Sequence, residues 1–218
     1  MLQIKKTIDG SYTLYNSDLE EHYHSINGAI QESEHVFINA GLKFIAQQKV
    51  KIFEVGFGTG LNAFLSYIES LKSGLQIKYS GIEKYPVEKS LVNELNYSEL
   101  ISPENHNIFE KLHESEWNKE IEISENFRFK KIAADFNEYV LNTTFDLIFF
   151  DAFAPDKQTE LWSQENFSKL YRSLNNGGIL VTYSSKGMVK QNLRNAGFIV
   201  QRLSGPPGKR HMLRALKQ

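Results

Sequence analysis

Four carboxylates stand where hydrophobic, strand-like runs of the sequence end: Glu54, Glu83, Asp135 and Asp151. A carboxylate can bind an amine, accept a proton or hold the two hydroxyls of a ribose diol. Because the carboxyl ends of parallel strands meet at one edge of a sheet, we expect all four side chains to open onto one crevice. This set of groups suits a nucleoside-type ligand beside an amino-bearing substrate.

Three glycines at alternate positions, Gly56, Gly58 and Gly60, lie in the stretch that begins at Glu54 and ends at Asn62. Glycine lets the backbone turn sharply and approach a ligand, and the helix-like sequence that follows offers unpaired N–H groups. The spacing is G-x-G-x-G, whereas the dinucleotide fingerprint is G-x-G-x-x-G. The stretch therefore predicts a nucleotide-type pocket, and its ligand could be NAD or a zwitterionic molecule that carries a cationic centre. The structural alternative is a plain tight turn.

Each of the first three carboxylates has a functional and a structural interpretation. Glu83 ends the second strand and is well placed to accept both hydrogens of a ribose diol. Glu54 can steady the glycine turn or a ligand's ammonium group, or can serve as structural support alone. Asp135 can accept from an adenine amino group, or can cap a helix that starts at Phe136.

Asp151 is the candidate for work on the substrate. It follows Phe150 at the end of the most hydrophobic run, and the turn to Pro155 should fix its position. Phe153 adds an aromatic face beside this acceptor, which suits a flat base that carries an amino group. The alternative is an aspartate that only caps a turn.

The elements that position these residues alternate between strand and helix. Apolar runs predict strands over 50–55, 76–82, 128–134, 145–150, 179–183, 198–203 and 212–216. Apolar periodicity predicts helices over 61–71, 87–95 (with Pro86 at its start), 136–141, 167–174 and 189–196. The alternation predicts an α/β fold: a seven-stranded, mostly parallel sheet with helices on both faces.

The 218 residues are predicted to form a single domain, 1–218. Residues 1–49 form an extension packed on it, with a hairpin that turns at Asp9-Gly10 and helical segments after Gly28. Its polar cluster, Glu21–Ser25 followed by Gln31-Glu32, could line a pocket. His22 and His24 within it are expected to be surface histidines rather than metal ligands. Residues 98–127 are interpreted as an acidic insertion, an amphipathic helix and loop outside the sheet.

Composition narrows the classes of function. The chain has no cysteine, which excludes disulfides, zinc–thiolate sites and a Cys nucleophile. No apolar run reaches the length of a membrane span and no secretory signal is present, so a cytoplasmic protein is expected. The formal net charge of −1 hides an asymmetry, since no acidic residue follows Glu165 while ten Lys and Arg do. This basic part indicates a polyanionic partner, with solvated basic helix faces as the alternative.

The stretch from Glu54 to Gly60 resembles the cofactor motif of class I S-adenosylmethionine-dependent methyltransferases, and Leu174 to Val181 resembles the approach to their fifth strand. More narrowly, several stretches in this order and spacing are similar to the MnmC-type methyltransferases of tRNA wobble-uridine modification. These stretches are 54–62, 83–86, 151–155, 182–185 and 208–212. The likeness runs from about Asp9 to Leu216.

This resemblance implies a Rossmann-like class I methyltransferase that uses S-adenosyl-L-methionine as donor, without metal or flavin. It implies methylation of the 5-aminomethyl group of 5-aminomethyl-2-thiouridine in the tRNA anticodon loop, a substrate that a separate enzyme would supply. Asp151 would bind and aim the amine, and Asp151 or water would carry its proton away. The cofactor-binding residues would be Glu54, Gly56, Gly58, Gly60, Asn62, Glu83 and Asp135. The substrate-binding residues would be Phe153, Pro155, Lys209 and Arg210, with Tyr85 as a second stacking candidate and Lys186, Lys190 and Arg194 as further phosphate contacts.

Two other classes of function are compatible with the sequence. An aminopropyltransferase of the spermidine synthase type would share the fold and its acidic residues, but a polycationic substrate fits a basic C-terminal part poorly. A non-catalytic module on the same fold could bind RNA or another protein. A hydride-transferring dehydrogenase is disfavoured by the glycine spacing.

Overall fold

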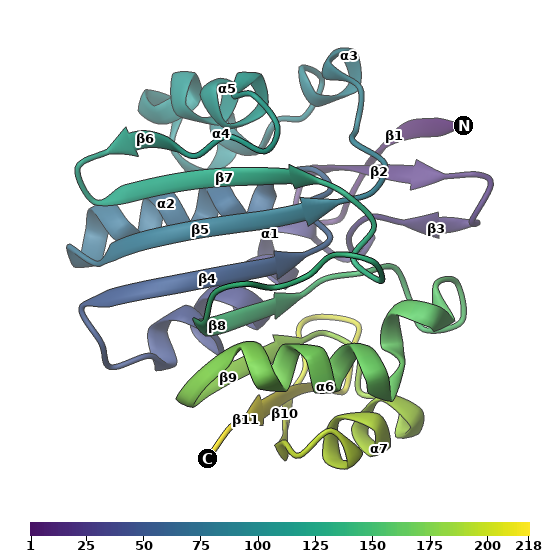
Figure 1. Ribbon diagram of the computed structural model, residues 1–218. Coiled ribbons are helices and arrows are strands. Elements are labelled where there is room, and N and C mark those ends of the chain that lie inside the picture. The colour runs from purple at the N-terminus through teal and green to yellow at the C-terminus, as the bar shows by residue number, and fades with distance from the viewer.

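A mostly parallel sheet of eight strands runs through the computed structural model, which describes residues 1–218 (Figure 1). The strand order is β10-β11-β9-β8-β4-β5-β7-β6. The strands are β4 (Lys49–Val55), β5 (Gln76–Glu83), β6 (Ile121–Ser124), β7 (Phe127–Ala133), β8 (Phe145–Phe150), β9 (Leu174–Thr182), β10 (Ile199–Ser204) and β11 (His211–Leu216). The pairings among β9, β8, β4, β5 and β7 are parallel, whereas β11 runs antiparallel to both its neighbours.

The predicted α/β class and all seven predicted strands are confirmed, and the sheet has one strand more than predicted. The extra strand is β6, which pairs antiparallel with β7. It comes from the segment 98–127, so the prediction that this acidic insertion lies outside the sheet is wrong. The alternation of Ile121 and Ile123 with polar residues is typical of a half-buried edge strand, and the surrounding glutamates conceal it.

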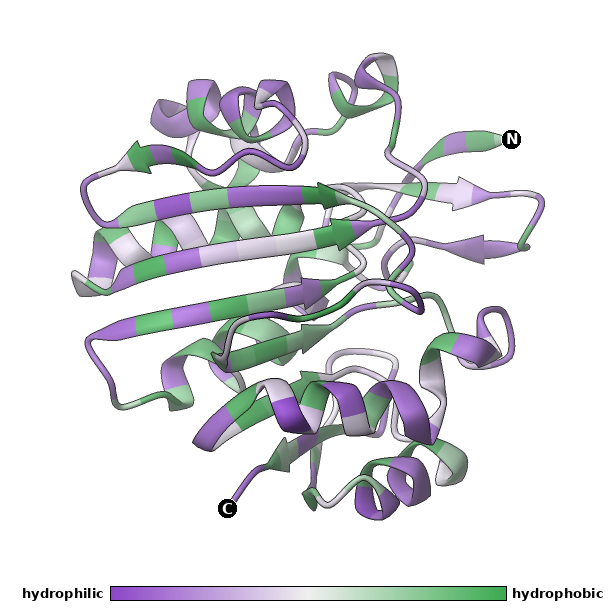
Figure 2. Cartoon of the chain, viewed as in Figure 1, coloured by the Kyte–Doolittle hydropathy of each residue, from purple (hydrophilic) through white to green (hydrophobic).

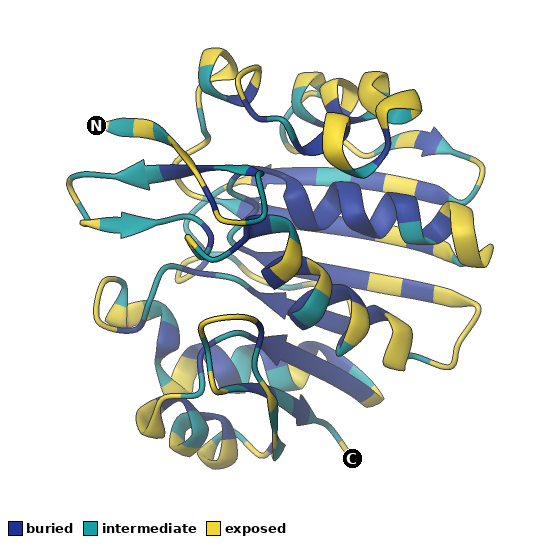
Figure 3. Ribbon diagram, turned by 180° about the vertical axis from the view of Figure 1, so that it is seen from behind, coloured by how far each residue is buried: buried dark blue, intermediate teal, exposed yellow.

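Helices cover both faces of the sheet. They are α1 (Ala29–Ser33), α2 (Leu61–Ser73), α3 (Lys89–Val92), α4 (Tyr97–Ile101), α5 (His106–Glu114), α6 (Gln164–Ser173) and α7 (Gly187–Asn195). Along β8, Leu147 and Phe149 pack into the core beneath α2, while Ile148 and Phe150 pack into the core beneath α6. Hydrophobic and hydrophilic residues alternate along α6 (Figure 2), and the central strands and α2 carry the buried colour in Figure 3.

Two predicted helices differ from the structure. The helix expected over 87–95 is reduced to α3, which starts at Lys89, three residues after Pro86. The helix expected over 136–141 is absent. There, the Asp135 carboxylate accepts hydrogen bonds from the backbone and side-chain nitrogens of Asn137, a local turn that competes with helix formation.

The first part of the N-terminal extension lies at the carboxyl ends of the parallel strands (Figure 1). Its strands β1 (Leu2–Lys6), β2 (Tyr12–Asn16) and β3 (Glu21–His22) form a separate antiparallel sheet. The predicted hairpin is confirmed as β1 and β2, and β3 is an addition. A π-helical segment (Glu34–Asn39) and a 3₁₀ turn (Leu42–Phe44) continue α1. No helix of the protein is long and apolar enough to span a bilayer.

Candidate functional site

A cavity of about 1420 Å³ opens at the carboxyl ends of the parallel strands. The loops after β4, β5, β7, β8 and β9, the loop between β10 and β11, and the N-terminal extension form its walls. Eleven of the predicted site residues line it: Gly56, Gly58, Glu83, Tyr85, Asp135, Asp151, Phe153, Pro155, Lys186, Lys209 and Arg210. The topology therefore brings residues from distant parts of the chain to one crevice, as expected for the ends of parallel strands.

The glycine loop is a tight turn that only glycine accommodates. Gly56, Gly58 and Gly60 have φ angles of 91°, 49° and 72°, in the left-handed region that other residues rarely adopt. A Cβ on Gly56 would lie 2.4 Å from the Asp151 carbonyl oxygen. The loop thus passes directly against the end of β8, and its backbone lies on the cavity wall.

Glu83 lies against this loop. One carboxylate oxygen accepts a hydrogen bond from the Gly58 N–H at 3.0 Å and the other from the Tyr85 N–H at 2.9 Å. Burial raises the pKa of Glu83, although these backbone hydrogen bonds favour the charged form. Each oxygen keeps a free lone pair, so the carboxylate can accept from two hydroxyls of a diol. The glycine backbone and Glu83 together fit the nucleoside part of an adenosyl ligand.

Behind the cavity wall, Asn62 joins the buried Glu54 carboxyl group to the half-buried Asp151 carboxyl group. Its side-chain nitrogen donates to Glu54 Oε1 at 2.9 Å and to Asp151 Oδ2 at 2.8 Å. Glu54 is fully buried and Asn62 is 2% exposed. Gly60, at the start of α2, is not on the cavity wall either. These three predicted cofactor residues therefore support the site from behind the wall. For Glu54, this is the structural role that the sequence analysis gave as the alternative to ligand binding.

The two carboxyl groups have strongly raised pKa values. Burial raises the pKa of Asp151 to about 8; the Glu32 carboxylate raises it further, and the Asn62 hydrogen bond and the Lys209 ammonium oppose the rise. Burial also raises the pKa of Glu54 well above its usual range. Asp151 can therefore take up or release a proton near pH 7.

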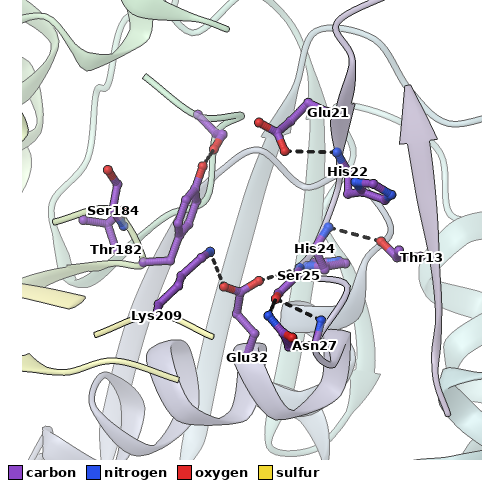
Figure 4. A network of polar contacts seen from close by, with 12 residues as sticks. Thr13, Glu21, His22, His24, Ser25, Asn27, Glu32, Thr182, Ser184 and Lys209 are labelled. Carbon is purple, nitrogen blue, oxygen red and sulfur yellow. Dashed lines mark hydrogen bonds and ion pairs between the residues drawn. The ribbon is translucent and has the colours of Figure 1, made fainter. Parts of the chain in front are cut away.

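Glu32 and Lys209 form an ion pair on the cavity wall (Figure 4). The other Glu32 oxygen accepts from the Ser25 N–H at 2.7 Å. The Lys209 ammonium also lies 3.9 Å from the centre of the Tyr183 ring. The Tyr183 hydroxyl in turn donates to the Ala152 carbonyl at 2.8 Å. Lys209, predicted to contact phosphate, is thus paired inside the site.

The polar cluster of the extension contributes to the same cavity, as its composition suggested. Glu21–Ser25 and Glu32 all line it, whereas Gln31 does not. Tyr23 packs edge-on against Phe153 with ring centres 4.8 Å apart. It also covers the glycine loop, since a Cβ on Gly58 would lie 3.1 Å from its ring. Tyr23 and Phe153 form an aromatic wall, and Tyr85 stands exposed at the rim.

Asp135 makes contacts other than those predicted. Its carboxylate pairs with the Lys84 ammonium at 2.8 Å, and the Lys84 hydrogen bond lowers its pKa. The interpretation as a helix cap is wrong, because Asp135 starts a turn rather than a helix. It lines the cavity, so a contact with a ligand amino group stays a prediction.

Two histidines, the buried His24 and the half-buried His113, hold Thr59 of the glycine loop. His24 Nε2 is 2.8 Å from the Thr59 hydroxyl, and His113 Nε2 is 3.1 Å from the Thr59 carbonyl oxygen. Burial lowers the pKa of each to about 4, so both rings are neutral at pH 7. The expectation that His24 is a surface histidine is wrong, since it is 8% exposed. No group of three or more His, Cys, Asp or Glu side chains is arranged to hold a metal ion.

Comparisons with known proteins agree with this geometry. A family model described as S-adenosyl-L-methionine-dependent methyltransferase matches residues 101–218. Two similar curated proteins are both named tRNA 5-methylaminomethyl-2-thiouridine biosynthesis bifunctional protein MnmC. The protein from Campylobacter fetus subsp. fetus is 30% identical over 212 residues, which cover 93% of this chain and 34% of the relative. The protein from Campylobacter hominis is 31% identical over 211 residues, covering 93% and 31%. The chain thus spans about a third of the length of these relatives.

Among solved structures, the crystal structure of MnmC2 from Aquifex aeolicus superposes with a TM-score of 0.81 at 29% sequence identity. The match covers 99% of this chain and 70% of that one. It therefore includes both the N-terminal extension and the loop that carries Lys209.

Proposed function

Because the chain belongs to the S-adenosyl-L-methionine-dependent methyltransferase family, we propose that it methylates the 5-aminomethyl group of 5-aminomethyl-2-thiouridine at the tRNA wobble position. The product would be 5-methylaminomethyl-2-thiouridine, the modification in the names of the curated relatives. The proposal includes the tRNA anticodon loop as partner, a separate enzyme that supplies the aminomethyl group, and the cytoplasm as the place of reaction.

The observation that carries the proposal is the position of Asp151. Its half-buried side chain lies on the wall of the same cavity as the glycine loop and Glu83. An amine bound at Asp151 therefore shares a cavity with the donor site. Bringing two reactants together in one site removes a large part of the entropic barrier to their reaction.

Methyl transfer to nitrogen requires a neutral amine, whereas an alkylamine near pH 7 is protonated. The pKa of an ordinary aspartate lies roughly 6.5 units below that of a lysine-like ammonium, so moving the proton from nitrogen to the carboxylate would cost about 9 kcal/mol. For Asp151, with its pKa at about 8, the gap falls to roughly 2.4 units, or about 3 kcal/mol. Burial of the carboxyl thus makes Asp151 a competent proton acceptor.

The bonds, the proton and the charges of this reaction all balance. The bound donor supplies a methyl group on a sulfonium, so the N–C bond forms as the S–C bond breaks. Asp151 accepts the proton that leaves the ammonium, and the methylated amine is released with the charge of a secondary ammonium. Asn62 and the Glu54 carboxyl behind it hold the Asp151 side chain in place during this exchange.

The remaining features suit a single-stranded RNA substrate. A base turned out of the anticodon loop can enter the cavity and stack on Phe153 or Tyr85. Arg210 is exposed at the cavity, and Lys190 and Arg194 lie on the neighbouring helix α7. These cations are available for phosphate groups of the loop.

A methyl-transfer assay with labelled S-adenosyl-L-methionine tests the proposal. The acceptors are tRNA bearing the aminomethyl group, the same tRNA without it, and putrescine. We expect label only in the first tRNA, at the wobble nucleoside after digestion. Aminopropyl transfer to putrescine from the decarboxylated donor would instead establish a spermidine synthase-type activity. Failure to bind S-adenosyl-L-methionine in calorimetry would point to a non-catalytic module.

A further inference from the structure

The ion pair between Glu32 and Lys209 joins two parts of the chain that are 177 residues apart. Glu32 is on α1 of the N-terminal extension, and its side chain is 6% exposed. One of its oxygens meets the Lys209 ammonium and the other meets the Ser25 N–H. Each oxygen of this buried carboxyl group thus has a partner.

Lys209 is fixed in position rather than free to follow an RNA backbone. Its ammonium is between Glu32 and the Tyr183 ring. The loop that carries it is folded on itself, with the Gly205 N–H donating to the Arg210 carbonyl at 3.1 Å. Gly208 has a φ of 82°, and a Cβ there would lie 2.0 Å from the Asn27 side-chain nitrogen. The loop is therefore docked on the extension at the cavity wall.

The charged groups that face Asp151 come from several elements. Glu32 on α1 and Lys209 in the β10–β11 loop act on it from the cavity side. Glu54 at the end of β4 faces it across Asn62 of α2, and burial raises the pKa of Glu54 well above its usual range. Burial raises the pKa values of the Tyr183, Tyr79 and Tyr97 hydroxyls, and the charge of Asp151 raises them further, so these hydroxyls are neutral. Glu32 and Lys209 are thus the charged side chains whose fields shift the pKa of Asp151.

We propose that Glu32 and Lys209 are positioning residues for methyl transfer: as a neutralised pair they set the charge that Asp151 and the substrate ammonium meet, and Lys209 makes no phosphate contact. This inference rests on the proposed function, in which Asp151 accepts the ammonium proton. It assigns different roles to two adjacent cations. Lys209 acts inward on the carboxyl group, while Arg210 is exposed and acts outward on RNA.

Opposite shifts follow from removing either charge. Lys209→Met leaves Glu32 negative near Asp151, so the Asp151 carboxyl ionises at higher pH. Glu32→Gln leaves Lys209 positive, so Asp151 ionises at lower pH and the substrate ammonium is repelled. Glu32→Gln with Lys209→Met removes both charges and brings the ionisation back toward that of the wild type. Lys209→Arg keeps the positive charge, so Asp151 should ionise at the same pH as in the wild type.

The test measures kcat/KM for methyl transfer to aminomethyl tRNA from pH 6 to 10 in these four variants and in Arg210→Met. We expect the acid limb to move up by about one pH unit in Lys209→Met and down by about one unit in Glu32→Gln, the size of effect that one nearby charge has. The limb should stay in place in Lys209→Arg, in the double variant and in Arg210→Met. Arg210→Met should instead weaken the dependence of KM on salt. Equal limbs in all variants, or a loss of salt dependence in Lys209→Met equal to that in Arg210→Met, would overturn the proposal.

A second measurement needs no substrate. Carbon-13 NMR of aspartate-labelled protein, with the Asp151 signal identified by its loss in Asp151→Asn, follows ionisation of the carboxyl directly. The same opposite shifts are expected in Lys209→Met and Glu32→Gln, and an unchanged titration would refute the charge-setting role. If these shifts occur but no tRNA accepts methyl groups, the proposed function is wrong, whereas the effect of Glu32 and Lys209 on the ionisation of Asp151 is confirmed. Circular dichroism establishes that each variant is folded.

Discussion

Replacing Asn62 with alanine is a direct way to alter Asp151 without touching the cavity. Asn62 is 2% exposed and donates to Asp151 Oδ2 at 2.8 Å. A hydrogen bond to a charged group contributes roughly 1.5–3 kcal/mol, which corresponds to about one to two pKa units. Its loss should raise the pKa of Asp151 from about 8 to the range of roughly 9–10.

This change should be visible in the pH dependence of kcat/KM for methyl transfer, which reports ionisation in the free enzyme. In the wild type the rate should rise with an apparent pKa near 8, since the ionised carboxylate accepts the proton. In Asn62→Ala the whole limb should move up, so the rate at pH 7 falls about 10- to 100-fold and recovers in alkaline buffer.

Ser70→Ala is a matched control on the same helix. Ser70 is fully buried and donates within α2 to the Tyr67 carbonyl, away from Asp151. It should lose some stability and keep the wild-type pH profile. An unshifted limb in Asn62→Ala, or an equal loss of rate at every pH, would refute the reasoning that Asn62 acts through the charge of Asp151.

Three further predictions concern the cofactor, the RNA and stability. Glu83→Gln should weaken S-adenosyl-L-methionine binding about 10- to 100-fold in calorimetry, since one charge-assisted hydrogen bond is lost, whereas the exposed Glu94→Gln should bind normally. Arg210→Met should reduce the slope of log affinity for the anticodon stem-loop against log salt by about one, and Arg128→Met, outside the cavity, should not. Burial lowers the pKa of His113 to about 4, so from about pH 6.5 down to 4 the unfolded chain takes up a proton that the folded protein excludes. Relative to the wild type, His113→Asn should therefore gain up to roughly 3 kcal/mol of unfolding free energy between pH 7 and pH 4; no relative gain in denaturant titrations would contradict this.

The fold and the shared crevice could be predicted because local patterns determine them. Apolar runs and glycines define each strand and turn, and parallel topology then brings Glu83 and Asp151 to one edge. The Rossmann-like class I methyltransferase fold implied by the resemblance is confirmed by the family match and the MnmC2 structure. The glycine conformations follow from the same local pattern.

The remaining site depends on packing between distant segments. Nothing in the local sequence joins Glu32 to Lys209 or places His113 against Thr59. Asn62 lies inside the glycine motif, so its sequence position suggests a cofactor contact. Only the packing of α2 against the strand ends shows that its amide faces two carboxyl groups instead.

The central claim is that Asp151 accepts the amine proton in the cavity that it shares with the donor site. Single-turnover methyl transfer to aminomethyl tRNA by Asp151→Asn tests it most directly, together with calorimetry of S-adenosyl-L-methionine binding. Asp156→Asn, in an exposed ion pair with Lys186, is the control. We predict a loss of roughly 10²- to 10⁴-fold in the transfer rate of Asp151→Asn, the usual contribution of a positioned proton acceptor, with donor binding retained. Transfer at nearly the wild-type rate in that variant would contradict the account.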